Sequence, residues 1–261
     1  MTEGHPLPGS PAPLTRFRLP HLSPRRLAVV LATVGAGSLL GASSASACGS
    51  AGYSYAGLSA TSHAYGIGAT VTRLAGFNVL SGHVAGWVGV GGPRQGPNGA
   101  DEWLQVGFSG FPSLGGNNLY YELMLPNGQP TYREIATNLP TGRPARVAVL
   151  EMIGRRDWWR VWVNGAPASS PIHMPASHAR WSPIATAESW DGGTGGACNG
   201  FLYRFHKVSI AHAPGGGWHT LLTSYKIGSS ETRLQQSTQK NGSFLAAEGD
   251  LALRTLASIT P

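Results

Sequence analysis

Apolar and polar side chains alternate along several short segments of the chain, which is the pattern of a β-strand with one buried face. In the clearest segment, Leu104, Val106 and Phe108 fall on one face, while Trp103 and Gln105 fall on the other. Successive side chains of a strand point to opposite sides of the sheet. We therefore expect a strand whose apolar face joins a core and whose second face is free to carry chemistry.

Segments of this kind recur roughly every ten to fifteen residues, as in antiparallel sandwiches and barrels. Glycine and proline cluster between them, and Asn127-Gly128 and Asn164-Gly165 are strong hairpin turns. We find no amphipathic helix before residue 229. The pattern predicts an all-β protein, an antiparallel β-sandwich in one domain. The expected strands lie near residues 70–74, 84–90, 104–108, 119–124, 131–136, 146–152, 158–163, 184–190, 201–205 and 217–227.

The first segment, residues 1–47, has the composition of a secretory signal peptide. Arg25 and Arg26 precede the apolar run 27–32, and small residues follow as far as Ala45-Ser46-Ala47. A basic stretch, an apolar stretch and a small-residue cleavage site define such a signal. The apolar run is short for a membrane span. We therefore expect a secreted protein with no stable membrane span in its mature chain.

We expect three segments after the signal peptide. Residues 48–68 are predicted to form an extended lead-in with at most one edge strand, and residues 69–228 to form the sandwich. Residues 229–261 are polar, and the sequence leaves open whether they pack on it. Removing the signal takes away four arginines and one acid, which lowers the formal net charge from +7 to +4. No basic block with interleaved aromatic residues occurs, so nucleic-acid binding is not expected.

Both cysteines of the chain, Cys48 and Cys198, lie after the signal. In an oxidising compartment a disulfide between them is the expected state. Attachment of a lipid to Cys48 is the alternative. The residues Ala45-Ser46-Ala47 lack the large apolar residue that lipoprotein signals carry, so the disulfide is favoured.

Aromatic and acidic side chains gather on the strand faces that oppose the apolar sets. A solvated sheet face normally carries small polar and charged residues. An aromatic face with a few acids is typical of a concave binding groove, although a second layer of core is the alternative. The residues on these faces are Trp87, Trp103, Gln105, Tyr120, Glu122, Glu188 and Trp190.

Four of these short motifs, taken in order, resemble the glutamic peptidases of the eqolisin type. The motifs are Trp87 to Gly92, Leu104 to Gly107, Tyr120 to Glu122, and Thr186 to Trp190. The resemblance implies a sandwich of the concanavalin A-like jelly-roll kind, which lectins and glucanases also share. It further implies that Gln105 and Glu188 occupy the two catalytic positions, and that Trp87, Trp103, Tyr120, Glu122 and Trp190 contact substrate.

The sequence departs from that family at several positions. Gly91 stands where the family usually has an aspartate, and Ser109 stands where an acid often follows the glutamine. The tryptophan after Glu188 comes one place late, at Trp190. Because of these departures, we expect fewer hydrogen-bonding groups around the catalytic pair than the family usually has.

The chemistry implied by the resemblance is hydrolysis of a peptide bond. Glu188 would take a proton from water and return one to the leaving amine, while Gln105 would orient that water and donate to the oxyanion. We expect such an enzyme to act in acid solution. No histidine pair has metal-ligand spacing, so we expect neither a metal nor a cofactor.

Three alternatives remain open from the sequence. Glu122 and Glu188 could be the two carboxylates of a glycosidase. The aromatic face could bind a carbohydrate or a peptide without chemistry, or the protein could be structural. The expected ligand is accordingly a polypeptide or a polysaccharide.

Overall fold

A computed structural model describes residues 52–75, 78–112, 117–195, 199–228 and 234–259. The predicted signal peptide, Cys48 and Cys198 lie outside these residues. The predicted cleavage, disulfide and lipid attachment therefore remain predictions.

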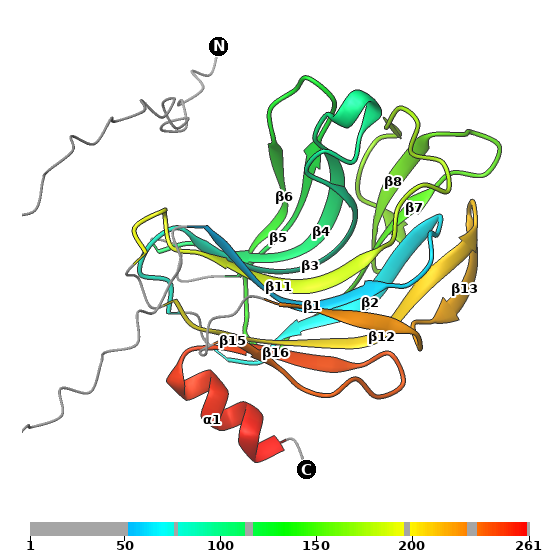
Figure 1. Cartoon of the computed structure of the whole chain (residues 1–261). Helices are drawn as coiled ribbons and strands as arrows, with labels where there is room; N and C mark the ends of the chain where they lie inside the picture. The colour runs from blue at the N-terminus through cyan, green and yellow to red at the C-terminus, as the bar shows by residue number, and fades with distance from the viewer. Residues whose placement is uncertain (1–51, 76–77, 113–116, 196–198, 229–233, 260–261) are drawn as a thin grey trace, which may run out of the picture. The chain divides into compact units, whose positions relative to one another are not determined.

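The described chain forms two antiparallel sheets (Figure 1). Every strand pairing is antiparallel, which confirms the predicted all-β sandwich. In order across the seven-stranded sheet, the strands are β14 (Ser224–Gly228), β1 (Tyr53–Ala60), β11 (Ile184–Trp190), β3 (His83–Gly92), β4 (Glu102–Gly110), β5 (Asn117–Met124) and β6 (Thr131–Leu139).

The second sheet contains nine strands and lies against the first. Its main path is β10 (Ile172–His173), β8 (Trp158–Val163), β7 (Pro144–Glu151), β2 (Gly66–Arg73), β12 (Phe201–Ala213), β16 (Phe244–Glu248) and β15 (Leu234–Gln236). Two short strands extend it, β13 (Gly216–Thr220) beside β12 and β9 (Ala166–Pro167) beside β8.

The core fills the space between the sheets with the apolar residues of the alternating strands. Val88 of β3, Val106 of β4 and Ala187 of β11 are fully buried there, and they belong to the same core cluster as Val71 and Phe205 of the other sheet. These residues are the inward set of each strand, as alternation predicts. The outward set of β3, β4, β5 and β11 therefore faces away from the core.

The region predicted as a lead-in contributes an interior strand, the second from one edge of the seven-stranded sheet. The sequence predicts at most an edge strand in residues 48–68, but β1 lies between β14 and β11 and pairs with both. Ala56 and Leu58 point into the core, which leaves Tyr53 and Tyr55 on the outward face. Leu58 is the one large residue of the inward set, and its companions Ala56 and Ala60 are small, so the period-two signal of β1 is weak in the sequence.

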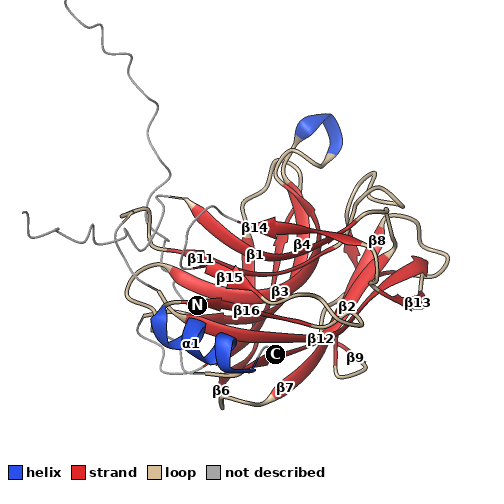
Figure 2. Cartoon of the chain, turned by 60° about the horizontal axis from the view of Figure 1, so that its bottom comes forward, coloured by secondary structure: helices blue, strands red, loops and turns tan. Residues whose placement is uncertain are grey.

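The C-terminal segment also joins the sandwich. Strand β16 pairs with β12, and helix α1 (Asp250–Ile259) lies on the outer face of the nine-stranded sheet (Figure 2). Its Ala252 and Leu256 pack on Leu202 and Ala247. A short 3-10 turn, η1 (Pro97–Gly99), precedes β4. Within the described residues, no helix is both long and apolar enough to cross a membrane.

Candidate functional site

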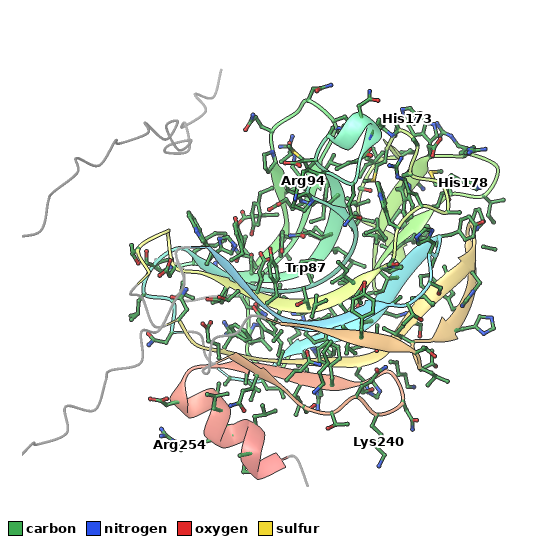
Figure 3. The ribbon with its side chains drawn as sticks, viewed as in Figure 1. Trp87, Arg94, His173, His178, Lys240 and Arg254 are labelled. Carbon is green, nitrogen blue, oxygen red and sulfur yellow. The ribbon has the colours of Figure 1, made fainter. Side chains whose placement is uncertain are left out.

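A cavity of about 620 Å³ opens on the outward face of the seven-stranded sheet. Figure 3 labels Trp87 in this region, where β3 lies beside β11. Both predicted catalytic residues line the cavity, and so do three of the predicted substrate contacts. These five residues are Gln105, Glu188, Trp87, Trp103 and Glu122.

Strand register brings Gln105 and Glu188 to opposite sides of one tryptophan. Strand β3 runs between their two strands, and Glu188 pairs with Ala85 while Gln105 pairs with Gly89. Trp87 lies midway between these two positions of β3. A side chain at Gly89 would meet both the Trp87 ring, at 3.1 Å, and Gln105 Cβ, at 2.9 Å. Because Gly89 has no side chain, the Trp87 ring can occupy the space above Gly89, next to Gln105.

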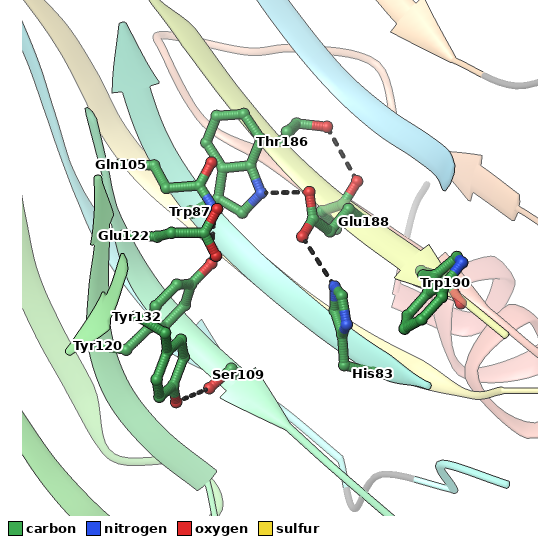
Figure 4. Close-up of polar contacts among 12 residues, drawn as sticks. His83, Trp87, Gln105, Ser109, Tyr120, Glu122, Tyr132, Thr186, Glu188 and Trp190 are labelled. Carbon is green, nitrogen blue, oxygen red and sulfur yellow. Dashed lines mark hydrogen bonds and ion pairs between the residues drawn. The ribbon is translucent and has the colours of Figure 1, made fainter. Parts of the chain in front are cut away.

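Each carboxylate oxygen of Glu188 has its own hydrogen-bond partner (Figure 4). The indole N–H of Trp87 donates to Oε2 at 2.9 Å, and His83 Nε2 lies 3.2 Å from Oε1. The Glu188 side chain is 8% exposed. Trp87 and His83 hold the two oxygens of the Glu188 carboxylate and so fix its orientation. The same side chain lines the cavity.

Gln105 is held from beneath by a buried tyrosine. Its Nε2 donates to the hydroxyl of Tyr120 at 3.1 Å. An amide nitrogen carries two donors, so a second N–H remains beyond this hydrogen bond, on a residue that lines the cavity. Tyr120 was predicted to contact substrate, but it is 2% exposed and does not line the cavity. Its place in the structure is that of a support for Gln105.

Glu122 forms a second carboxylate position in the cavity. The indole N–H of Trp103 donates to its Oε1 at 3.0 Å. Burial raises the pKa of Glu122, the Trp103 hydrogen bond opposes that shift, and repulsion by Glu188 adds to it. Glu122 thus holds its proton to a higher pH than an ordinary glutamate.

Trp190 lies beside the cavity and not among its lining residues. Its ring stacks on Tyr53 with a centroid distance of 5.9 Å and an interplanar angle of 12°. Tyr53 stacks in turn on Tyr55, and both tyrosines line the cavity. Burial, with Glu188 nearby, raises the pKa of Tyr53 to about 12, so this phenol is neutral in ordinary conditions.

The sequence left two alternatives for the aromatic face, a binding groove or a second layer of core, and the structure shows features of both. Trp87 packs with Ala85 and Tyr120 in a small apolar cluster on the outward face, and it also lines the cavity. The face is therefore a groove with its own thin layer of packing beneath it.

Sequence reasoning missed three residues of this site: His83, Tyr53 and Tyr55. His83 has the same strand parity as Trp87, so period-two alternation places both on one face. The same alternation in β1, read with Ala56 and Leu58 as the inward set, places both tyrosines on the outward face.

Two of the positions that depart from the glutamic-peptidase pattern, Gly91 and Ser109, have structural explanations. Gly91 has φ of +78°, and a side chain there would lie 2.2 Å from the carbonyl oxygen of Glu102. This backbone therefore excludes an aspartate. Ser109 instead shares a 2.8 Å hydrogen bond with the hydroxyl of Tyr132, so a neutral pair stands where an acid is usual.

A separate polar cluster closes a turn on the nine-stranded sheet. His178 Nδ1 lies 2.9 Å from Oε1 of the buried Glu151, and the same oxygen accepts the backbone N–H of Asp157. These contacts tie one loop to another. In the described part of the chain, no three His, Cys, Asp or Glu side chains are grouped to hold a metal ion.

Solved structures of glutamic peptidases share the fold. Two complexes of scytalido-glutamic peptidase, one with a peptide-based transition-state analogue and one with a transition-state-analogue inhibitor, each match with a TM-score of 0.51 at 13% identity. SCP-B, a member of the eqolisin family of peptidases in complex with the tripeptide Ala-Ile-His, matches with a TM-score of 0.50 at 14% identity. Each match covers 76% of this chain and 98% of the other.

Sequence comparison adds no relative, because no protein-family model and no curated protein matches the chain. At this level of identity a structural match shows the fold and leaves the activity to be argued from the site. The chain therefore has the sandwich fold found in the glutamic peptidases.

Proposed function

We propose that the protein is a glutamic-peptidase-like hydrolase that is exported and cleaves polypeptides in acid solution. The observation that carries the proposal is the shared cavity, in which Glu188 and Gln105 flank the Trp87 ring. Export rests on the signal-like residues 1–47. N-terminal sequencing of the exported protein tests it, and we expect the mature chain to begin at Cys48.

In the proposed reaction Glu188 acts first as a base. It takes one proton from a water molecule as the water oxygen bonds to the carbonyl carbon of the peptide. The carbonyl oxygen becomes an oxyanion, which the free N–H of Gln105 stabilises. The C–N bond then breaks, and the proton held by Glu188 passes to the departing amine. Glu188 ends the cycle as a carboxylate.

The surroundings of Glu188 suit this reaction in acid solution. Because the pKa of Glu122 is raised, Glu122 becomes neutral at a higher pH than an ordinary glutamate. A neutral Glu122 does not repel the carboxylate of Glu188, so protonation of Glu122 removes one negative charge from the cavity. Fixed hydrogen bonds from Trp87 and His83 keep that carboxylate in one orientation.

The test is cleavage of an unfolded protein substrate by the purified mature chain between pH 2 and 7. Glu188→Gln removes the base with little change of shape. Glu134→Gln on β6 is the matched control, at an exposed residue whose hydrogen bond from Asn118 Nδ2 a glutamine oxygen can also accept. We expect acid cleavage by the wild type and the control and none by Glu188→Gln. Equal cleavage by Glu188→Gln would reject the proposed role of this residue.

Carbohydrate recognition is the second candidate, favoured by the two carboxylates and the half-exposed ring of Tyr53 around the cavity. Stacked aromatic rings suit sugar faces, and two carboxylates suit a glycosidase. Binding and hydrolysis of a polysaccharide panel test it. Hydrolysis that disappears in both Glu122→Gln and Glu188→Gln, without peptide cleavage by the wild type, would establish the glycosidase. Binding without hydrolysis would establish a binding module.

A further inference from the structure

His83 touches the proposed base directly, and no step described above uses its charge. Its Nε2 lies 3.2 Å from Glu188 Oε1, and its side chain is 20% exposed and lines the cavity. The opposite oxygen of Glu188 accepts the Trp87 indole. Unlike an indole, an imidazole can change its charge within the pH range of the proposed activity.

The imidazole is held in place by aromatic rings from three parts of the chain. Its centroid lies 5.7 Å from Tyr53, 5.6 Å from Trp190 and 6.0 Å from Phe111. Strand register adds a second constraint, because His83 pairs with Trp190 two residues along β11 from Glu188. The contact between His83 and Glu188 is therefore built by packing on several sides.

The titratable groups that interact with this pair come from β1, β5 and β12, and burial raises the pKa of the β5 and β12 phenols, Tyr120 and Tyr203, so both are neutral. Burial raises the pKa of Tyr53 to about 12 and that of Tyr55 further, so both phenols are neutral in acid and neutral solution. Glu122 is the other carboxyl group, and its raised pKa makes it neutral in acid. In acid solution neither these phenols nor Glu122 places a negative charge beside the contact between His83 and Glu188.

We propose that His83 is a positioning residue that keeps Glu188 ionised, and therefore active as a base, in acid solution. A protonated imidazole beside a carboxylate favours the charged form of that carboxylate. Through the same contact it fixes the direction of Oε1. This inference rests on the proposed function and adds the group that adapts Glu188 to acid.

The first test is the pH profile of kcat/KM on a peptide substrate for the wild type and His83→Gln. Glutamine retains an N–H donor but not the charge. We expect the acid limb of the profile, where the base is lost by protonation, to move upward by about one pH unit. His173→Gln on β10, whose imidazole packs on Trp158, is the matched control and should leave the profile unchanged. An unmoved acid limb in folded His83→Gln would overturn the inference while leaving the peptidase proposal intact.

A second test needs no activity. NMR titration of the full chain follows the imidazole of His83 in the wild type and in Glu188→Gln. Removing the carboxylate should lower the pH at which this imidazole titrates, by roughly half a unit to one unit. If the wild type cleaves no peptide, the peptidase proposal fails and this titration still decides on the pair. Identical His83 titration in both proteins would reject the coupling of the two residues.

Discussion

The seven-stranded sheet has two faces made by the same strands, one of aliphatic side chains and one of paired polar and aromatic side chains. On β3 and β4 the inward face carries Val88 and Val106, both fully buried in the core. The outward face carries Trp87 and Gln105, each hydrogen-bonded to another residue of that face. The two faces thus bury their residues by different means.

The difference shows what each face is for. Apolar packing stabilises the fold without any requirement for pairing. Buried polar groups instead lose solvation, which their hydrogen bonds only partly restore. Glu188 and Glu122 are both mostly buried on the outward face, each with an indole donor. A face built for stability alone would hold valines here, so the polar face indicates a function.

The largest effect is expected when a side chain of the inward face is truncated. Phe108→Ala removes a fully buried ring from β4. We expect it to lower the free energy of unfolding by about 3–5 kcal/mol, measured by urea denaturation. Leu222→Ala, at a side chain that is 70% exposed, is the control and should change it by less than about 0.5 kcal/mol. A loss below about 1 kcal/mol for Phe108→Ala would contradict the assignment of the core face.

On the outward face the expected loss is in activity more than in stability. Trp87→Phe keeps a ring but removes the indole N–H that Glu188 accepts. We expect kcat/KM on a peptide to fall by roughly 10- to 100-fold, which corresponds to about 1–3 kcal/mol for an unmade hydrogen bond to a charged group. Trp218→Phe, on β13 of the other sheet, should leave kcat/KM unchanged. Wild-type kinetics in Trp87→Phe would show that this hydrogen bond does not serve catalysis.

Glu102, a buried carboxyl group on the inward side of β4, gives the smallest expected effect. Its side chain is fully buried, and neither carboxylate oxygen has a hydrogen-bond partner among the described residues. Burial raises its pKa from 4.5 to about 7. The folded state therefore favours the protonated form, and stability is lost as the pH rises from about 4.5 to about 7.

Glu102→Gln should remove most of that dependence. We expect the variant to exceed the wild type by roughly 1–2 kcal/mol in the free energy of unfolding at pH 8, and to equal it near pH 4. Urea denaturation at the two pH values measures the difference, and Glu134→Gln serves again as the exposed control. Parallel pH dependences for Glu102→Gln and the wild type would show that Glu102 is charged and paired in the folded protein.

Alternation along the chain was enough to predict the two faces of each strand. The valines of β3 and the apolar residues of β4 lie in the core, and Trp87, Gln105 and Glu188 lie on the opposite face, because the direction of a side chain is a local property of the strand. The same information predicted that Glu188 and Gln105 share a face. It could not predict that Trp87 lies between them, which depends on the register of three strands.

What the sequence could not predict is non-local. The segment 217–227 reads as one strand, but it forms β13 in one sheet and β14 in the other. The buried Leu221 marks the crossing between them. The position of β1 inside the sheet, and with it Tyr53 in the cavity, depends on pairing with β14 and β11, which are far away in the chain.

The central claim is that Glu188 and Gln105 activate water together in this cavity. The measurement that tests it most directly is kcat/KM on one defined peptide at acid pH for the wild type, Glu188→Gln and Gln105→Ala, with the fold of each checked by circular dichroism. We predict a loss of about 10³-fold or more for Glu188→Gln and of about 10²- to 10³-fold for Gln105→Ala. A folded Glu188→Gln that retains activity within about ten-fold of the wild type would contradict the account.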